Sequence, residues 1–189
     1  NEDINTAFNL YRDGVLITQK PLTGATNYID KDGNENSTYQ VAGVLDGVEE
    51  EKSKAAKVLS NNYMSIPLDI PQGGRTPSGE EYTFTPNDCS VGDLDGDGTY
   101  EIVVKWEPTN AKDNSQGGYT GPTILDAYTL DGKKLWRIDL GINIRSGPHY
   151  TQFMVYDLDG DGKAEVACKT ADGTIDGKGK DIGDKDKDY

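Results

Sequence analysis

The sequence is poor in cysteine and histidine. It contains two cysteines, Cys89 and Cys168, and one histidine in 189 residues. Two cysteines form at most one bridge, which excludes a small fold held together by several disulfides. Both lie beside strand-like segments, so we expect buried thiols, with one bridge between neighbouring strands as the alternative. His149 lies near neither cysteine in the sequence, so we identify no thiol nucleophile.

Long apolar runs and an excess of positive charge are also missing. No stretch approaches the roughly 18–20 apolar residues of a membrane span. Lys and Arg total 19 against 33 Asp and Glu, a formal net charge of −14, so nucleic acid and anionic membranes are poor partners. The acidity is typical of a soluble secreted protein, and also of one that binds cations. The chain begins at Asn1, as a mature or trimmed product does, so the missing signal peptide does not argue against export.

Aspartate and glycine are concentrated in two copies of one motif. The first copy is Asp93–Glu101, and the second, Asp157–Glu165, starts 64 residues later. Each has Asp at positions 1, 3 and 5, Gly at positions 4 and 6, and Glu at position 9. Glycine supplies the positive-φ backbone of a tight loop, in which alternate aspartates can turn their carboxylates toward one centre. Such carboxylates repel one another unless a hard cation lies between them, and calcium takes about 6–8 oxygen ligands.

We therefore predict two calcium (Ca2+) loops with four acidic side chains each. A solvated acidic loop is the alternative, because runs of alternate aspartates also occur without a metal. Strand-like residues follow each Glu, which distinguishes the motif from a helix–loop–helix calcium site. The expected ligands are Asp93, Asp95, Asp97 and Glu101 in the first loop, and Asp157, Asp159, Asp161 and Glu165 in the second.

Residues 1–60 are predicted to form a small β domain. Ala7–Arg12 alternates between apolar and polar residues and runs into Asp13-Gly14, a strong hairpin signal. The hairpins resemble those of a fibronectin type III or immunoglobulin-like sandwich of about seven strands. About five strands are recognisable, so we expect the chain to start inside the domain. The further strands expected are Val15–Ile17, Asn27–Asp30, Tyr39–Val44 and an edge strand near Ser53–Leu59, which we favour over a helix.

Residues 61–86 are predicted to be an extended, proline-containing linker, and residues 61–189 the start of a larger β domain. Four short antiparallel strands in about 64 residues are typical of a propeller blade with one long loop. Fewer than two blades cannot close a propeller, so we expect a longer protein. We expect no strand after Lys169. The expected strands are Tyr100–Trp106, Thr123–Tyr128, Lys134–Ile138 and Tyr150–Tyr156.

Longer motifs carry a resemblance to a known family. They are Asn87–Gly98, Lys105–Pro108, Lys112–Gln116, Asn143–Phe153 and Lys169–Thr174. Together they resemble the family 11 polysaccharide lyases, the bacterial rhamnogalacturonan lyases, over nearly the whole chain, which matches the N-terminal third of the family protein. The resemblance implies an all-β fold: a fibronectin III-like β-sandwich, truncated at its N-terminus, followed by the first blades of an eight-bladed calcium-binding β-propeller. It also implies a secreted protein, which we expect to be monomeric.

The activity of that family is β-elimination at galacturonate in the pectin backbone rhamnogalacturonan I. The C5 proton of galacturonate lies next to a carboxylate and is very weakly acidic. A metal on that carboxylate neutralises its charge and stabilises an enolate-like intermediate, after which a base takes the proton and the bond from C4 to oxygen breaks. Calcium also lets an acidic protein bind an acidic polysaccharide.

The resemblance suggests site residues by position. Asn87 matches an asparagine of the family's substrate-side calcium site, and Glu107 stands where an aspartate is expected, so its carboxylate reaches one methylene further. Arg145 is a candidate for pairing with a substrate carboxylate, with a surface salt bridge as the alternative. Lys169 and His149 are candidates for moving a proton. The alternative for Lys169 is that it only marks the register of the repeat, and the alternative for His149 is a structural role in a turn. The other calcium ligands, and the base itself, are expected outside this chain.

Two other functions share part of this pattern. A non-catalytic calcium-binding propeller used in adhesion would need the aspartate loops, but not Asn87, Glu107 or the Arg145–His149 segment. A carbohydrate-binding module is the second alternative. The resemblance favours the lyase, and we expect the 189-residue chain alone to be inactive.

Overall fold

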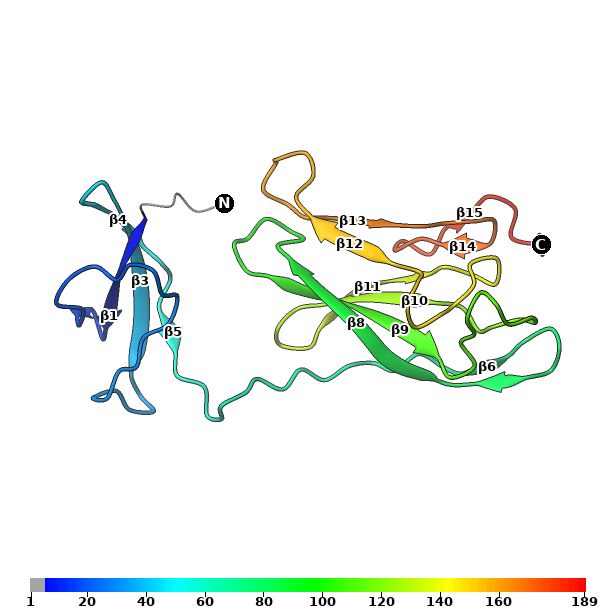
Figure 1. The fold of residues 1–189 in the computed structure, drawn as a ribbon, viewed down its shortest axis with the longest axis horizontal. Coiled ribbons are helices and arrows are strands. Elements are labelled where there is room, and N and C mark those ends of the chain that lie inside the picture. Colours follow the sequence, from blue (N-terminus) through cyan, green and yellow to red (C-terminus); the bar gives the residue numbers. More distant parts are fainter. Residues whose placement is uncertain (1–5) are drawn as a thin grey trace. The chain divides into compact units, whose positions relative to one another are not determined.

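The computed structural model describes residues 6–189 and is built from β-strands (Figure 1). The chain divides into two compact units, Asn1–Ser65 and Ile66–Tyr189. Within the described range, no helix is long and apolar enough to cross a membrane. The all-β fold class expected from the sequence is therefore confirmed.

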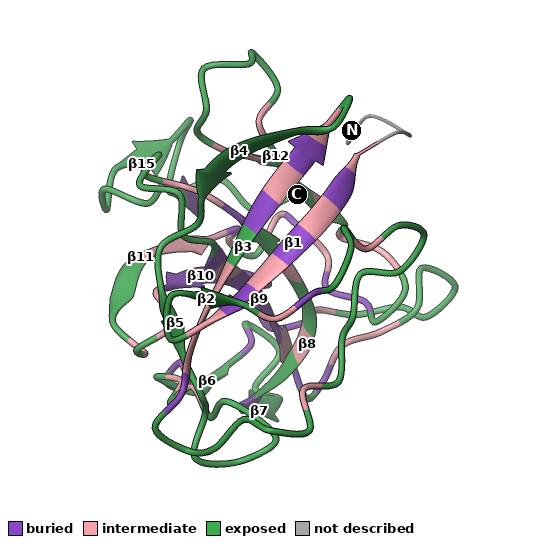
Figure 2. Cartoon of the chain, turned by 90° about the vertical axis from the view of Figure 1, so that its left-hand side faces the viewer, coloured by how far each residue is buried: buried purple, intermediate pink, exposed green. Residues whose placement is uncertain are grey.

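The N-terminal unit is a five-stranded antiparallel sheet in which β1 and β3 form the centre. Residues along β1 alternate between buried and half-buried (Figure 2), as the two faces of a strand do. The buried face is not the more apolar one, because Asn9 is buried whereas Phe8 and Leu10 are half-buried. Asp13 and Asp46 have φ of 51° and 50° and each precedes a glycine, so Asp-Gly turns close both hairpins, the first of them as predicted. The strands are β1 (Ala7–Arg12), β2 (Val15–Leu16), β3 (Thr38–Leu45), β4 (Val48–Lys52) and β5 (Ala56–Lys57).

One strand predicted in this unit is absent, and another is shorter than expected. The segment Asn27–Asp30 forms no strand. Its last residue is held by side chains instead, because Arg12 and Tyr39 each donate hydrogen bonds of 2.8 Å to the Asp30 carboxylate. These bonds, from Tyr39 first and then Arg12, lower the pKa of Asp30. The edge strand expected near Ser53–Leu59 is present as the two-residue strand β5, and the strand before it, β4, was not predicted; both pair with β3.

The C-terminal unit is organised around a six-stranded antiparallel sheet of order β15-β14-β11-β10-β9-β8. Strands β8 to β11 follow one another in sequence and in space, so they form a meander (Figure 1). The strands predicted from Tyr100 to Ile138 are confirmed. The sheet contains β8 (Phe84–Gly92), β9 (Glu101–Pro108), β10 (Ile124–Tyr128), β11 (Lys134–Asp139), β14 (Thr174–Ile175) and β15 (Asp181–Ile182).

Two short hairpins complete this unit: β6 (Gly74–Arg75) with β7 (Glu81–Tyr82), and β12 (Phe153–Tyr156) with β13 (Glu165–Cys168). The first hairpin interrupts the predicted linker, which is irregular over residues 64–73. The expectation of no strand after Lys169 is wrong. Strand β14 extends the sheet by pairing Ile175 with Asp139 of β11, and its Thr174 is fully buried.

Each face of the large sheet has its own apolar cluster. One cluster joins Phe84, Val104, Trp106, Ile124 and Tyr128, with Leu68 of the irregular segment packed against it. The other joins Val103, Leu125 and Ala127 to Val155 of β12, with Trp136 partly buried beside them. The β12–β13 hairpin therefore covers the second face. Trp106 and Trp136 thus pack on opposite faces of the sheet.

A buried carboxylate lies in the first cluster. Asp126 is 0% exposed and accepts hydrogen bonds from Trp106 Nε1 at 2.9 Å, from the Tyr128 hydroxyl at 2.9 Å and from Arg137 Nε at 2.7 Å. Arg137 also donates to the backbone carbonyl of Asp69 at 2.9 Å, so the network ties the irregular segment to the sheet. Burial, followed by the bond to Asp126, raises the pKa of Tyr128 to about 12.

The two copies of the aspartate motif meet at Gly92, the last residue of β8. A Cβ at Gly92 would lie 2.6 Å from Ala164 Cβ and 2.8 Å from Val155 Cγ1. Beside it, the Ala164 amide donates a 2.6 Å hydrogen bond to the Asp93 carbonyl. Glycine at this position therefore allows the first loop to pack directly on the second copy.

Replacing Gly92 with alanine is expected to lower the free energy of unfolding by about 1–3 kcal/mol, because the added methyl group overfills this contact. Chemical denaturation of the chain measures it. Gly14 provides a comparison in which only backbone strain is added, because its φ is 79° but a Cβ there would meet no atom within 4 Å. A Gly92→Ala chain as stable as the unsubstituted one would contradict the close packing.

Candidate functional site

The two aspartate loops each bring three carboxylates together. In the first loop, Asp93, Asp95 and Glu101 place carboxylate oxygens within 4.8 Å of one another. Asp157, Asp159 and Glu165 do the same in the second loop. The Glu of the first loop is buried, whereas Asp95 and Asp159 are exposed. Three convergent hard oxygen donors fit a cation of the calcium class, which would compensate their mutual repulsion.

The backbone of each loop holds its first aspartate in the same way. Asp93 Oδ1 accepts the amide of Gly96 at 2.7 Å, and its Oδ2 accepts the amide of Gly98 at 2.8 Å. Asp157 accepts the amides of Gly160 and Gly162 at 2.7 and 3.0 Å. All four glycines have positive φ, between 79° and 89°, which turns their amides inward. The carboxylates are thus oriented by the chain itself.

The last residue of each loop is fixed as well. Glu101 Oε2 accepts the Leu94 amide at 2.8 Å, and Glu165 Oε2 accepts the Leu158 amide at 2.8 Å. The remaining predicted ligands, Asp97 and Asp161, are outside the convergent groups of three. Their Oδ1 atoms accept the amides of the residues two positions later, at 2.7 and 2.8 Å. The structure therefore gathers three of the four predicted side chains in each loop.

A separate polar group lies at a bulge in β8. Pro86 pairs with Trp106 and Cys89 pairs with Val104, so two residues of β8, Asn87 and Asp88, face only one residue of β9. Asn87 Nδ2 donates a 2.6 Å hydrogen bond to Glu107 Oε2. The structure thus brings together the two residues that the sequence assigned to the substrate side. Bulges of this kind redirect side chains next to binding sites.

The bulge contains an ion pair that sequence reasoning missed. Lys105 Nζ lies 2.8 Å from Asp88 Oδ2, and Lys105 is 1% exposed. A lysine placed directly between apolar residues, Val104 and Trp106, was the available signal, because a buried charge needs a partner. Its position four residues after a loop Glu suggested only repeat register.

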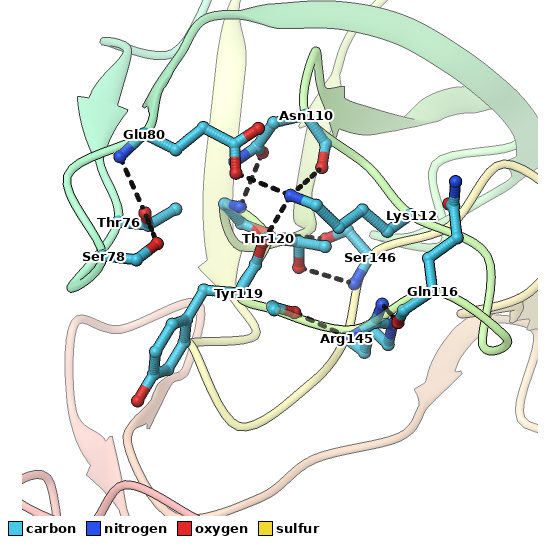
Figure 3. A network of polar contacts seen from close by, with 12 residues as sticks. Thr76, Ser78, Glu80, Asn110, Lys112, Gln116, Tyr119, Thr120, Arg145 and Ser146 are labelled. Atoms are coloured by element: carbon cyan, nitrogen blue, oxygen red, sulfur yellow. Dashed lines mark hydrogen bonds and ion pairs between the residues drawn. The ribbon is translucent and has the colours of Figure 1, made fainter.

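Arg145 holds the polar segment between β9 and β10 in place through hydrogen bonds (Figure 3). Its guanidinium donates to the backbone carbonyls of Gly118 at 2.9 Å, Asp113 at 3.1 Å and Gln116. Lys112 supports the same segment by donating to Glu80 at 2.6 Å and to the Tyr119 carbonyl at 2.8 Å. No ion pair of Arg145 is formed within residues 6–189, so the surface salt bridge considered for it is not present.

The remaining candidates are on the surface. His149 and Lys169 are both exposed. Cys89 is exposed and Cys168 half-buried, and both are free thiols, so the expectation of buried thiols is wrong for Cys89 and the alternative of one bridge is not realised. Cys89 is exposed because it lies on β8, the outer strand of the large sheet. Partial burial still raises the pKa of both thiols.

Comparison with known proteins places this architecture in a family. Residues 63–189 match the model of the C-terminal domain of rhamnogalacturonan lyase family 11, and residues 1–59 match the β-sheet domain of rhamnogalacturonan I lyases. The chain is 60% identical over 188 residues to rhamnogalacturonan endolyase YesW, and 60% identical over 184 residues to rhamnogalacturonan exolyase YesX, both from Bacillus subtilis. These alignments cover 100% and 97% of this chain.

The chain spans about 30% of the length of each of these relatives. The crystal structure of YesX superposes on the whole chain with a TM-score of 0.86 at 58% identity, over 31% of that structure. The shared segment is common to an endolyase and an exolyase. The chain belongs to rhamnogalacturonan lyase family 11.

Proposed function

We propose that this chain is the N-terminal part of a secreted rhamnogalacturonan lyase, which cleaves the rhamnogalacturonan I backbone by calcium-assisted β-elimination at galacturonate. The observation that carries the proposal is the contact of 2.6 Å between Asn87 and Glu107, in a chain of this family. A carboxylate and an amide meet there at a bulge, where neither is needed to close the sheet. Their oxygens are the ligand types that calcium prefers.

At this site the chain would supply part of the cation's coordination. Glu107 would provide a carboxylate oxygen and Asn87 an amide oxygen, with further ligands from outside this chain. The bound calcium would neutralise the galacturonate carboxylate and so make the C5 proton easier to remove. Arg145 would act indirectly, because its hydrogen bonds to three backbone carbonyls keep the polar segment after β9 in place.

The aspartate loops have a structural role in this proposal. Each would bind calcium and brace the turn between two strands, leaving catalysis to the residues at the bulge. The meander β8–β11 and its partner hairpin β12–β13 are consistent with the first blades of a β-propeller, preceded by a fibronectin III-like module at residues 1–60. The family match over residues 63–189 supports this division.

The full-length protein is expected to release unsaturated uronate from rhamnogalacturonan only when calcium is present. The reaction is followed by the ultraviolet absorbance of the new double bond, with calcium and with a chelator. Glu107→Gln is expected to lower kcat/KM by about 100-fold, because an amide oxygen replaces a charged ligand. Glu81→Gln, at an exposed position on β7, is the matched control and is expected to retain activity. An absence of calcium-dependent product from the full-length protein would exclude the lyase.

A further inference from the structure

The buried ion pair of Lys105 and Asp88 lies between two strands at the bulge that carries Asn87. We propose that Lys105 is a positioning residue for the cation site of the lyase: it fixes the bulge through Asp88, and the bulge in turn aims Asn87 at Glu107. This inference rests on the proposed function, since it concerns the same site. It assigns a role to two residues that touch neither substrate nor cation.

The burial of Lys105 makes its partner indispensable. The Lys105 side chain is 2% exposed and that of Asp88 is 51% exposed, at a separation of 2.8 Å between Nζ and Oδ2. Leaving an ammonium buried without its counter-charge is strongly unfavourable. Asp88 is therefore held toward Lys105, although half of its side chain is open to solvent. The ion pair holds the backbone of the bulge in one conformation.

A continuous set of contacts leads from this ion pair to the site. The Asp88 amide donates to Asn87 Oδ1 at 2.8 Å, and Asn87 Nδ2 donates to Glu107 Oε2 at 2.6 Å. Lys105 and Glu107 are two residues apart on β9, so their side chains point to the same face of the sheet. A shift of Asp88 would thus change the orientation of the Asn87 side-chain amide.

The second copy of the motif shows that the fold does not require this arrangement. The pairing of Cys89 with Val104 recurs as that of Phe153 with Cys168, so the two hairpins share one register. Lys169 stands 64 residues after Lys105 but is exposed. The positions equivalent to Asn87, Asp88 and Glu107 are occupied by Thr151, Gln152 and Ala171. The hairpin of the second copy forms without the buried ion pair, whereas the copy with Asn87 and Glu107 has it.

The direction in which calcium affinity changes when Lys105 is removed distinguishes a positioning role from a simple effect of its charge. Lys105 is a cation near a proposed cation site, so by charge alone its removal would tighten calcium binding. Positioning gives the opposite result, because a bulge released from Asp88 no longer orients Asn87. We expect Lys105→Met to weaken calcium at this site by about 10- to 100-fold, the usual effect of losing a residue that orients a ligand.

Calorimetric calcium titration of the full-length protein tests this. The site is identified as the one that Glu107→Gln weakens. The double variant Asp88→Asn/Lys105→Met leaves no uncompensated buried charge, which protects the test if the single variant folds poorly, and it is also expected to weaken the site. Lys134→Met, which removes a different lysine–aspartate pair in the same unit, is the control and should leave the site unchanged. Unchanged or tighter calcium binding in the double variant would overturn the inference.

The lyase assay distinguishes this inference from the function on which it rests. The calcium concentration for half-maximal activity is expected to rise in Lys105→Met in parallel with the weaker binding. If the unsubstituted protein binds calcium at this site but cleaves nothing, the proposed function fails while the positioning role stands. If the protein is active and the double variant requires no more calcium than the unsubstituted enzyme, the positioning role fails alone.

Discussion

Replacing Asp126 with alanine is expected to lower the free energy of unfolding of the chain by about 3–5 kcal/mol, the usual cost of breaking a buried charged pair from one side. The substitution would leave the buried Trp106 indole N–H and Tyr128 hydroxyl without their acceptor, and the Arg137 guanidinium without its counter-charge. Urea denaturation followed by tryptophan fluorescence measures the change, and Trp106 reports on the network directly.

A second aspartate of the same network provides the control. The Asp69 side chain is 63% exposed and pairs with Lys134, whereas its backbone carbonyl is what Arg137 binds. Asp69→Ala keeps that carbonyl, so we expect it to change stability far less than Asp126→Ala. If Asp126→Ala unfolds within about 1 kcal/mol of the unsubstituted chain, as an ordinary surface substitution does, the network does not stabilise the sheet.

Removing calcium is expected to lower the melting temperature of the chain by on the order of 10 °C. A ligand at 100 times its dissociation constant adds about 2.7 kcal/mol of stability per site, and two loops would add about twice that. The measurement is thermal unfolding with calcium and with a chelator. The double variant Asp93→Asn/Asp157→Asn is expected to melt at the same temperature in both conditions, since each loop then lacks the carboxylate of its first aspartate.

The control for charge is Asp46→Asn in the β3–β4 turn. Asparagine tolerates the φ of 50° at this position, so the variant removes one negative charge without straining the turn. It should keep the full response to calcium. A melting temperature that is the same with calcium and with chelator in the unsubstituted chain would contradict cation binding at the loops.

The parts of the fold that follow from local sequence were predictable. A strand such as Ala7–Arg12 and a turn at an Asp-Gly pair each depend on residues only a few positions apart in the sequence. The aspartate loops are similar, because Gly96 and Gly98 position the amides that orient Asp93 five or fewer residues away. Spacing predicted that four carboxylates converge in each loop, but not that one aspartate of the four lies outside the group.

The parts that depend on pairing across the sheet were not predictable. Strand β14 is two residues long and joins the sheet through Ile175 and Asp139, so no periodicity marks it. The contact of Asn87 with Glu107 depends on the bulge after Pro86, which only the register of β8 against β9 defines. Asp126 is a charged residue within an apolar strand, and two of its three partners, Trp106 and Arg137, lie on neighbouring strands and reach it only in the folded sheet.

The meander β8–β11 has a kinetic consequence. Every pairing among these four strands is between neighbours in the sequence, so the contacts that form the centre of the sheet are of low contact order. Such a sheet can assemble hairpin by hairpin, without waiting for strands that come later in the sequence. Contacts between residues far apart in the sequence then form as late steps. Examples are the pairing of Ile175 with Asp139 and the hydrogen bond from the Ala164 amide to the Asp93 carbonyl. Substitutions at Gly92 should therefore accelerate unfolding more than they slow folding.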